Sequence, residues 1–226
     1  MKRSLLSLLM ILLLAASMQA QLFFDNRPAF WPALSLRKSF GDHWRVTLEH
    51  STRMKFSPFM LDESYIQLAT EYKFNPAIAV EMNYRFSGNF DMEDGWTPAH
   101  RISAEADFRT NAKRWYFTLH PAVQWTFSRE DRNSGRDFGW AIRPKMVIDY
   151  DIAKTSLEPY AALELYIGKR APEEPFSAYK YRGTLGLDYN IKKYLGASIF
   201  IRQQGGLFNT YQRSYTIAGL EFTFKI

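Results

Sequence analysis

The sequence predicts an all-β protein, a single transmembrane antiparallel β-barrel of the up-and-down type, and three observations lead there. Strand-length segments that alternate apolar and polar residues recur over residues 31–226. Tight turns and longer polar loops alternate between these segments. The polar face of the segments, as in Glu81, Asn83 and Arg85, is too rich in charge for the core of a soluble protein. Apolar residues therefore face lipid and charged residues face the inside of the barrel.

The first twenty residues have the pattern of a secretory signal peptide. Lys2 and Arg3 precede an apolar run over residues 5–16, and Ala20 stands before Gln21 at the expected cleavage point. The run is too short for a comfortable membrane-spanning helix. We therefore expect residues 1–20 to be removed and residues 21–226 to form one outer-membrane barrel domain. The chain has no cysteine, which excludes disulfides, thiolate metal sites and a lipid-modified cysteine.

Charge and length narrow the class of protein further. Cleavage would remove Lys2 and Arg3, which lowers the formal net charge from +6 to +4. Such a balanced charge does not favour a nucleic-acid binder, and no nucleic-acid partner is expected. A mature chain of about 206 residues suits a barrel of roughly 10 to 12 strands.

Eleven segments have the length of a bilayer-crossing strand. They cover residues 30–40, 44–53, 64–74, 77–87, 100–110, 114–127, 138–152, 157–167, 179–191, 194–203 and 214–226. Tight turns are predicted at 41–43, 75–76, 111–113, 153–155 and 192–193, and longer loops around 57–58, 88–96, 129–137, 169–176 and 205–213. This asymmetry is typical of outer-membrane barrels, with short turns in the periplasm and longer loops outside the cell.

The number of strands is a problem, because eleven segments would make the closing pair parallel. Bacterial barrels normally have an even number of strands. We therefore expect about twelve, with an additional strand within residues 21–27, although Pro28 and Pro32 weaken pairing there. The alternative is a ten-stranded barrel with one segment outside the wall, which leaves the role of residues 21–30 open.

The apolar face of the strands forms a band with aromatic residues near both ends. The band comprises Val46, Leu48, Ile66, Leu68, Ile78, Val80, Leu119, Val123, Ile142, Met146, Ile148, Leu163, Leu165, Leu185, Leu187, Ile199, Leu220 and Phe222. Aromatic residues near the turns are Trp44, Phe74, Phe108, Trp115, Tyr150 and Phe224, and those near the loops are Phe86, Trp125, Phe127 and Trp140. Two such belts suit the two interfaces of a bilayer.

The inward face is predicted to carry a polar network of nearly matched charge. Its members are Arg45, Glu49, Glu71, Glu81, Arg85, Arg101, Glu105, His120, Arg143, Asp149, Glu158, Glu164, Arg182, Asp188, Arg202 and Glu221. Arg37, Arg53, Lys73, Asp107, Arg109, Lys145, Asp151 and Lys225 share this face. In a narrow barrel such residues fill the lumen as ion pairs. The alternative is a conducting or ligand-binding channel.

No catalytic, cofactor or metal site is predicted. His50 and Ser51 are neighbours on a strand and point to opposite faces. His120 faces inward beside Thr118, without a serine at the required spacing. The expected function is that of a non-enzymatic narrow pore, binding barrel or structural envelope protein. The alternatives are a lipid-modifying barrel enzyme, with a serine and histidine from different strands, and a soluble secreted barrel that binds a ligand inside.

Several strand patterns resemble a known family. They are Leu157-Glu158-Pro159-Tyr160 with Glu164, residues 181–189, Trp31 with the hairpin of residues 38–44 and Glu49, and Glu71-Tyr72-Lys73-Phe74. Together these are similar to the envelope-barrel family called domain of unknown function 2490. The resemblance implies a barrel in the outer membrane of a Gram-negative cell, without a known activity or any catalytic residue to assign.

The partners follow from this location. Outer-membrane lipid would surround the barrel, and residues 215–226, with Leu220, Phe222, Phe224 and Ile226 alternating, resemble the terminal strand that the barrel-assembly machinery binds. The sequence does not indicate a substrate or an oligomeric state.

Overall fold

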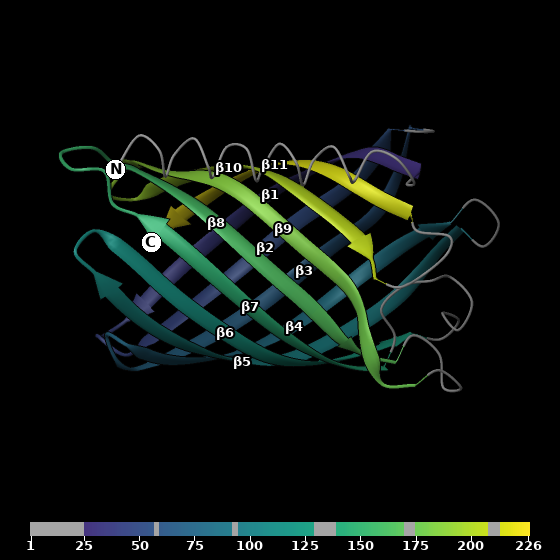
Figure 1. Ribbon diagram of the computed structural model, residues 1–226, viewed down its shortest axis with the longest axis horizontal. Coiled ribbons are helices and arrows are strands. Elements are labelled where there is room, and N and C mark those ends of the chain that lie inside the picture. Colours follow the sequence, from purple (N-terminus) through teal and green to yellow (C-terminus); the bar gives the residue numbers. More distant parts are fainter. Residues whose placement is uncertain (1–24, 57–58, 92–94, 129–138, 170–174, 208–212) are drawn as a thin grey trace, which may run out of the picture.

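The computed structural model describes residues 25–56, 59–91, 95–128, 139–169, 175–207 and 213–226. These residues form one closed barrel of eleven strands in the order β1-β11-β10-β9-β8-β7-β6-β5-β4-β3-β2 (Figure 1). The strands are β1 Asp25–Phe40, β2 Trp44–Phe56, β3 Phe59–Asn75, β4 Ile78–Asp91, β5 Gly95–Ala112, β6 Trp115–Ser128, β7 Gly139–Tyr150, β8 Leu157–Gly168, β9 Ser177–Lys192, β10 Leu195–Gly206 and β11 Arg213–Lys225. The predicted all-β barrel is confirmed. The predicted signal peptide, residues 1–20, lies outside the described residues.

The barrel has a turn end and a loop end. The tight turns after β1, β3, β5, β7 and β9 gather at the left of Figure 1, and the other ends of the strands lie at the right. The chain also finishes at the turn end, where the amide of Ile226 donates a hydrogen bond of 2.8 Å to the carbonyl oxygen of Arg37. Among the described residues, no helix has the length and hydropathy of a membrane span.

Local chemistry explains the tight turns. Gly41 adopts a φ of +62°, a left-handed conformation that glycine takes without steric cost. The side-chain oxygen of Asn75 accepts hydrogen bonds from the amides of Ala77 and Ile78 at 2.8 and 2.9 Å, so the side chain itself holds that turn. The sequence placed these turns to within one or two residues.

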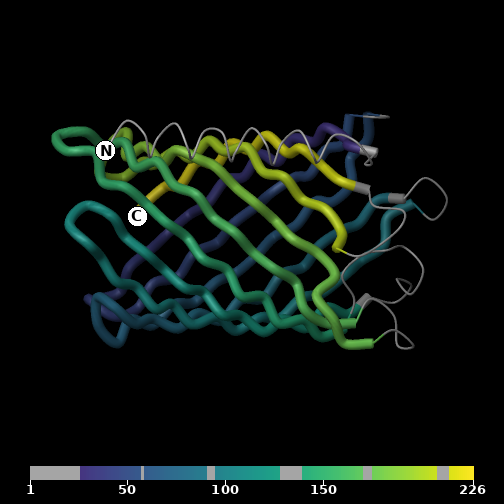
Figure 2. The backbone as a smooth tube through the Cα atoms, viewed as in Figure 1, coloured from purple at the N-terminus to yellow at the C-terminus, as the bar shows by residue number. Residues whose placement is uncertain are grey.

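The predicted strand number is wrong for the described residues, which form eleven strands and not twelve or ten. β1 and β11 run parallel, with Asp25 opposite Arg213 and Arg37 opposite Lys225, so an odd number of strands closes without an extra one. Residues 25–27 are the first residues of β1 and not part of a separate strand, and residues 21–24 lie outside the described part. Figure 2 follows the backbone from the purple β1 to the yellow β11 at this closing pair.

Side chains compensate for the two prolines of β1. The pairing of β1 with β2 omits Trp31 and Pro32, and the Ser51 hydroxyl donates instead to the Pro32 carbonyl oxygen at 3.0 Å. Across the parallel seam, the Asn26 side-chain amide donates to the Thr216 hydroxyl at 2.9 Å. Proline therefore removes ladder hydrogen bonds here without ending the strand.

The strands extend further toward the loop end than the sequence predicted. β4 continues to Asp91 and β5 begins at Gly95, so most of the predicted loop over residues 88–96 is strand. Its polar residues looked like loop residues, but Asn89 pairs with Thr97 and both are buried on the wall. The predicted loops over 57–58 and 129–137, and most of those over 169–176 and 205–213, lie outside the described residues.

The outward face carries the predicted apolar band. Leu48, Ile66 and Leu163 are 44%, 53% and 51% exposed. Exposed aromatic residues lie near both ends of the strands, with Trp44 and Trp115 at the first positions of β2 and β6, and Trp125 and Trp140 stacked at 5.6 Å near the loop end. The outside of the barrel is thus apolar, and its charged side chains point inward.

Candidate functional site

The lumen has two halves of different character. Toward the loop end, arginine and aromatic side chains interleave, and toward the turn end there is an open cavity of about 680 Å³. Of the predicted network, ten members line this cavity: Arg45, Glu71, His120, Asp149, Glu158, Glu164, Arg182, Asp188, Arg202 and Glu221. Glu49, Arg85, Arg101 and Arg143 bond to other inward side chains, and Glu81 and Glu105 face each other on β4 and β5.

The arginine–aromatic cluster comprises Trp31, Arg53, Tyr65, Arg85, Arg101, Arg143, Tyr166, Arg182 and Arg202. Its centre is Trp31, which points inward from β1. The guanidinium carbons of Arg53, Arg182 and Arg202 lie 4.2, 5.6 and 5.4 Å from the Trp31 ring centroid. These arginines come from β2, β9 and β10, so the stacking joins strands that are not neighbours.

Two tyrosines extend the stacking around the wall. The Arg85 guanidinium lies 3.6 Å from the Tyr65 ring centroid. Arg143 and Arg182 lie 5.0 and 4.9 Å from the ring of Tyr166, which is only 1% exposed. Cations over aromatic faces are stabilised when water is excluded.

Two buried glutamates neutralise part of the cluster. Glu63 forms an ion pair with Arg53. Glu164 accepts hydrogen bonds from Arg143 Nε at 2.9 Å, Arg182 Nη1 at 3.4 Å and the Tyr166 hydroxyl at 3.2 Å. Both carboxylates are less than 10% exposed, and buried charges need such partners.

The other three arginines of the cluster bond to neutral groups. Arg85 Nε donates to Gln67 Oε1 at 2.9 Å, Arg101 Nε to Thr126 Oγ1 at 3.1 Å, and Arg202 Nε to Thr184 Oγ1 at 2.9 Å. Arg85 and Arg101 also stand directly opposite each other on β4 and β5. The nearly matched charge predicted for the whole lumen is therefore unevenly distributed, and within the described residues this half is cationic.

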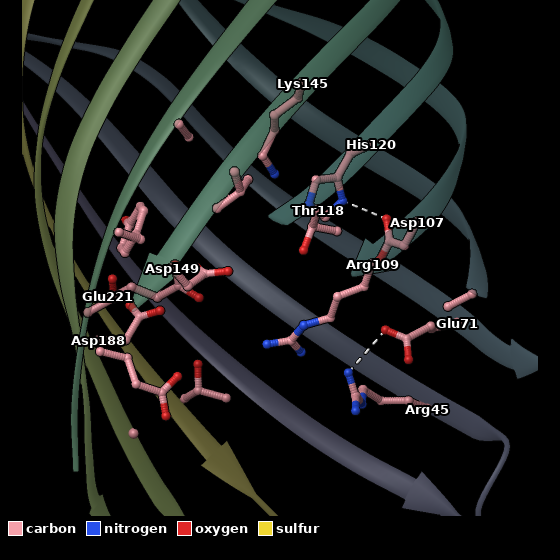
Figure 3. Close-up of a pocket in the computed structure, with 18 of the residues that line it drawn as sticks. Arg45, Glu71, Asp107, Arg109, Thr118, His120, Lys145, Asp149, Asp188 and Glu221 are labelled. Atoms are coloured by element: carbon pink, nitrogen blue, oxygen red, sulfur yellow. Dashed lines mark hydrogen bonds and ion pairs between the residues drawn. The ribbon is translucent and has the colours of Figure 1, made fainter. Parts of the chain in front are cut away.

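The cavity fills the turn-side half of the lumen. Its lining runs from Asn75 and Pro76 at a tight turn to Glu164, Arg182 and Arg202, where the arginine–aromatic cluster begins. Figure 3 shows Arg109 and Lys145 reaching into this space, with Asp149, Asp188 and Glu221 on the other side. Arg45 and Glu71 form an ion pair of 3.0 Å on the wall.

A row of acidic side chains crosses the wall beside this cavity. Glu71 of β3 stands opposite Glu81 of β4, which stands opposite Glu105 of β5. His120 of β6 closes the row, with its Nδ1 atom 2.5 Å from Asp107 Oδ1 and 3.1 Å from Glu105 Oε1. One ligand atom each from Glu105, Asp107 and His120 lies within 4.8 Å of the others, a geometry compatible with a metal ion.

The remaining histidines have other contacts. His43 Nδ1 lies 2.7 Å from the Lys73 carbonyl oxygen, and His50 Nδ1 lies 3.1 Å from the Tyr65 carbonyl oxygen. His100 Nδ1 shares a hydrogen bond of 2.8 Å with the Tyr84 hydroxyl. His50 is exposed on the outer face and Ser51 is buried, as the alternation predicted.

Sequence reasoning missed the aromatic members of the lumen and the grouping of Glu105, Asp107 and His120. A signal for the aromatic residues was present, because Trp31 has the same parity as inward Arg37, and Tyr166 the same as Glu164. No sequence spacing indicated the grouping, since its members come from two strands whose register fixes it.

The fold and this lumen define a closed, mostly antiparallel β-barrel with an apolar outside and a charged inside. The chain belongs to the family described as "Protein of unknown function (DUF2490)", whose sequence profile matches residues 29–214. This match spans the barrel from β1 to the start of β11 and confirms the resemblance found from the strand patterns. No curated protein matches the sequence.

Proposed function

We propose that the protein is a non-enzymatic integral outer-membrane β-barrel that serves as a binding or structural component of the envelope and not as a wide, open pore. The observation that carries the proposal is the arrangement of the two faces. Met82, Leu185 and Ile201 are 57%, 56% and 65% exposed on the outside, whereas charged residues line the inside. A soluble ligand-binding barrel has the opposite arrangement, since its apolar residues face inward and water surrounds it.

The strand lengths support a bilayer-spanning wall. The shortest strands have 12 residues and the longest, β5, has 18. A tilted strand needs about 9 to 11 residues to cross the hydrocarbon region. The exposed tryptophans near both ends of the strands fit the interfacial belts of such a wall.

The proposed orientation places the turn end in the periplasm and the loop end outside the cell. Short turns on the periplasmic side are the rule for outer-membrane barrels. After export through residues 1–20, the barrel-assembly machinery would bind β11, and outer-membrane lipid would cover the apolar band. The cavity would then open toward the periplasm, where soluble ligands have access to it.

The arginine–aromatic cluster supports a closed lumen. Trp31 contacts arginines of three other strands, and Glu164 bonds to two more side chains across the wall. A steady ion current needs a continuous wet path, and these contacts occupy the loop-side half of the lumen.

Fractionation of cell envelopes tests the location. The mature chain is expected to stay with the outer membrane through a carbonate wash, and an unboiled sample is expected to migrate differently from a boiled one on a detergent gel. Recovery as a soluble periplasmic protein would contradict the proposal.

Planar-bilayer recordings test the closed lumen. Wild-type protein is expected to give little steady conductance, and Trp31→Ala combined with Arg202→Ala is expected to raise it because both side chains fill the centre of the cluster. Arg45→Ala, on the cavity wall, is the matched control and is expected to leave the current low. A large, ion-selective wild-type conductance would make the protein a porin-like channel.

A serine-directed covalent probe tests the enzyme alternative. We expect no labelling of the folded barrel. Labelling that His120→Ala abolishes would instead support a lipid-modifying enzyme.

A further inference from the structure

We propose that Glu105, Asp107 and His120 form a binding site for a divalent transition-metal cation, such as Zn²⁺, on the wall of the turn-side cavity. The site goes beyond the proposed membrane function and does not depend on it, because it lies within the barrel itself. Failure of metal binding would leave the membrane location standing, and a soluble barrel would still hold the site.

The convergence of two carboxylates on one ring nitrogen is the first argument. Asp107 Oδ1 and Glu105 Oε1 lie 2.5 and 3.1 Å from the same atom, His120 Nδ1. That nitrogen carries at most one proton, which makes one good hydrogen bond and leaves the second carboxylate with half of a shared one. A cation with two positive charges in the same place would attract both carboxylates and the imidazole lone pair together.

The surrounding charge is a second, independent argument. Glu81 stands opposite both Glu71 and Glu105, and like charges directly opposite each other destabilise a sheet. Glu71 is 8% exposed, and its Oε1 atom is buried without a hydrogen-bond partner among the described residues. Arg45 neutralises only the far end of the row, through Glu71 Oε2. The near end has an excess of negative charge that a divalent cation would offset.

The geometry needs only a small adjustment to hold a metal. Zn²⁺ binds nitrogen and oxygen ligands at about 2.0 to 2.2 Å, so two ligands in tetrahedral or octahedral arrangement are about 3.0 to 3.4 Å apart. Glu105 already meets this spacing, and Asp107 must retreat by roughly half an ångström or more. Three protein ligands of mixed imidazole and carboxylate type leave room for water on the metal.

The site is also accessible. Asp107 and His120 line the cavity, and the side chains of Glu105, Asp107 and His120 are 22%, 28% and 15% exposed. Lys145 of β7 stands opposite His120 and is the nearest competing cation on that side. Its removal would therefore strengthen metal binding, an effect that a purely structural His120–Asp107 hydrogen bond does not predict.

The test is a zinc titration of the purified mature barrel in detergent, in competition with a chromophoric chelator. We expect one Zn²⁺ per chain. His120→Ala and the isosteric Asp107→Asn should each weaken the affinity by more than about 100-fold, because even changes around a metal ligand typically cost 10- to 100-fold. Lys145→Met should tighten binding, and acidification should weaken it, because the ligands bind in their deprotonated forms. Asp149→Asn, on the opposite side of the cavity, is the control and should bind as the wild type does.

A spectroscopic measurement on the wild type keeps the proposal testable if a variant does not fold. X-ray absorption at the zinc edge should show one imidazole nitrogen and otherwise oxygen ligands at about 2.0 to 2.2 Å. Absence of stoichiometric binding, binding undiminished in both His120→Ala and Asp107→Asn, or a spectrum with several imidazoles would overturn it.

Discussion

The two halves of the lumen are built by the same strands with the same alternation, yet one is packed and the other is open. On the loop side the inward positions include Trp31, Tyr65 and Tyr166. On the turn side they include small residues, such as Ala79, Ala162, Ala197 and Gly196. Charge occurs in both halves, so the size of the uncharged neighbours decides where the lumen closes.

The difference also changes what each charge is worth. The carboxylates of the packed half, Glu63 and Glu164, are 8% and 7% exposed and have charged partners at short range. In the open half, Arg45 and Lys73 are 29% and 42% exposed as side chains, so water solvates them. Removing one partner should therefore cost much more in the packed half.

Glu164→Ala is expected to have the largest effect on stability. It leaves Arg143 and Arg182 buried without their carboxylate, and breaking a buried pair costs about 3 to 5 kcal/mol. Denaturant unfolding in detergent or liposomes measures the loss. Glu158→Ala, an exposed carboxylate on the same strand, is the control with an expected loss below about 1 kcal/mol. Equal losses would mean that the halves do not differ in solvation.

Leu163→Arg tests the outer face next to Glu164 on the same strand. Leu163 is 51% exposed, and a charge facing the bilayer midplane of a barrel costs about 2 to 4 kcal/mol. The cost falls to about 0 to 1 kcal/mol near an interface, so Phe224→Arg at the turn end should be mild. Unfolding from lipid bilayers compares the two. A small effect of Leu163→Arg would place that side chain away from lipid.

Gly186→Ala tests how closely the wall is packed inside. A methyl group at Gly186 would lie 2.4 Å from the ring of Tyr160, which covers this glycine from β8. Such overpacking typically costs about 1 to 3 kcal/mol. Gly183→Ala on the same strand meets no atom within 4 Å and should be neutral or slightly stabilising. The comparison uses the same unfolding measurement, and equal effects would show that Tyr160 moves aside freely.

Much of the fold was predictable because each strand carries its own signal. The period of two in Val80, Met82 and Tyr84 fixed which face turns outward, and Gly41 and Asn75 marked their turns. The strand number was not predictable, since the closing pair joins the two ends of the chain and leaves no local trace. The rule that bacterial barrels have even strand numbers led to twelve, whereas β1 and β11 close in parallel.

The inward face was predictable as a set of residues but not as an arrangement. Parity places Arg53, Arg182 and Arg202 inside, yet their meeting at Trp31 depends on barrel diameter and strand tilt. The separation into a cationic packed half and an open half likewise depends on register between strands. Only the three-dimensional closure brings Asp107 to His120.

Two ion pairs of similar chemistry sharpen the comparison with the smallest expected effect. Arg45–Glu71 lies on the cavity wall, with the arginine side chain 29% exposed, and Arg53–Glu63 lies in the packed half, with 13% and 11% exposure. A double-mutant cycle with Arg45→Ala and Glu71→Ala should give a coupling of about 1 kcal/mol or less that falls with added salt, since water and ions reach the arginine. The same cycle on Arg53 and Glu63 should give a larger coupling with little salt dependence, because the stacked rings of Trp31 and Tyr65 exclude water from Arg53. If both couplings respond equally to salt, solvent reaches both halves and the packed half is a wet passage.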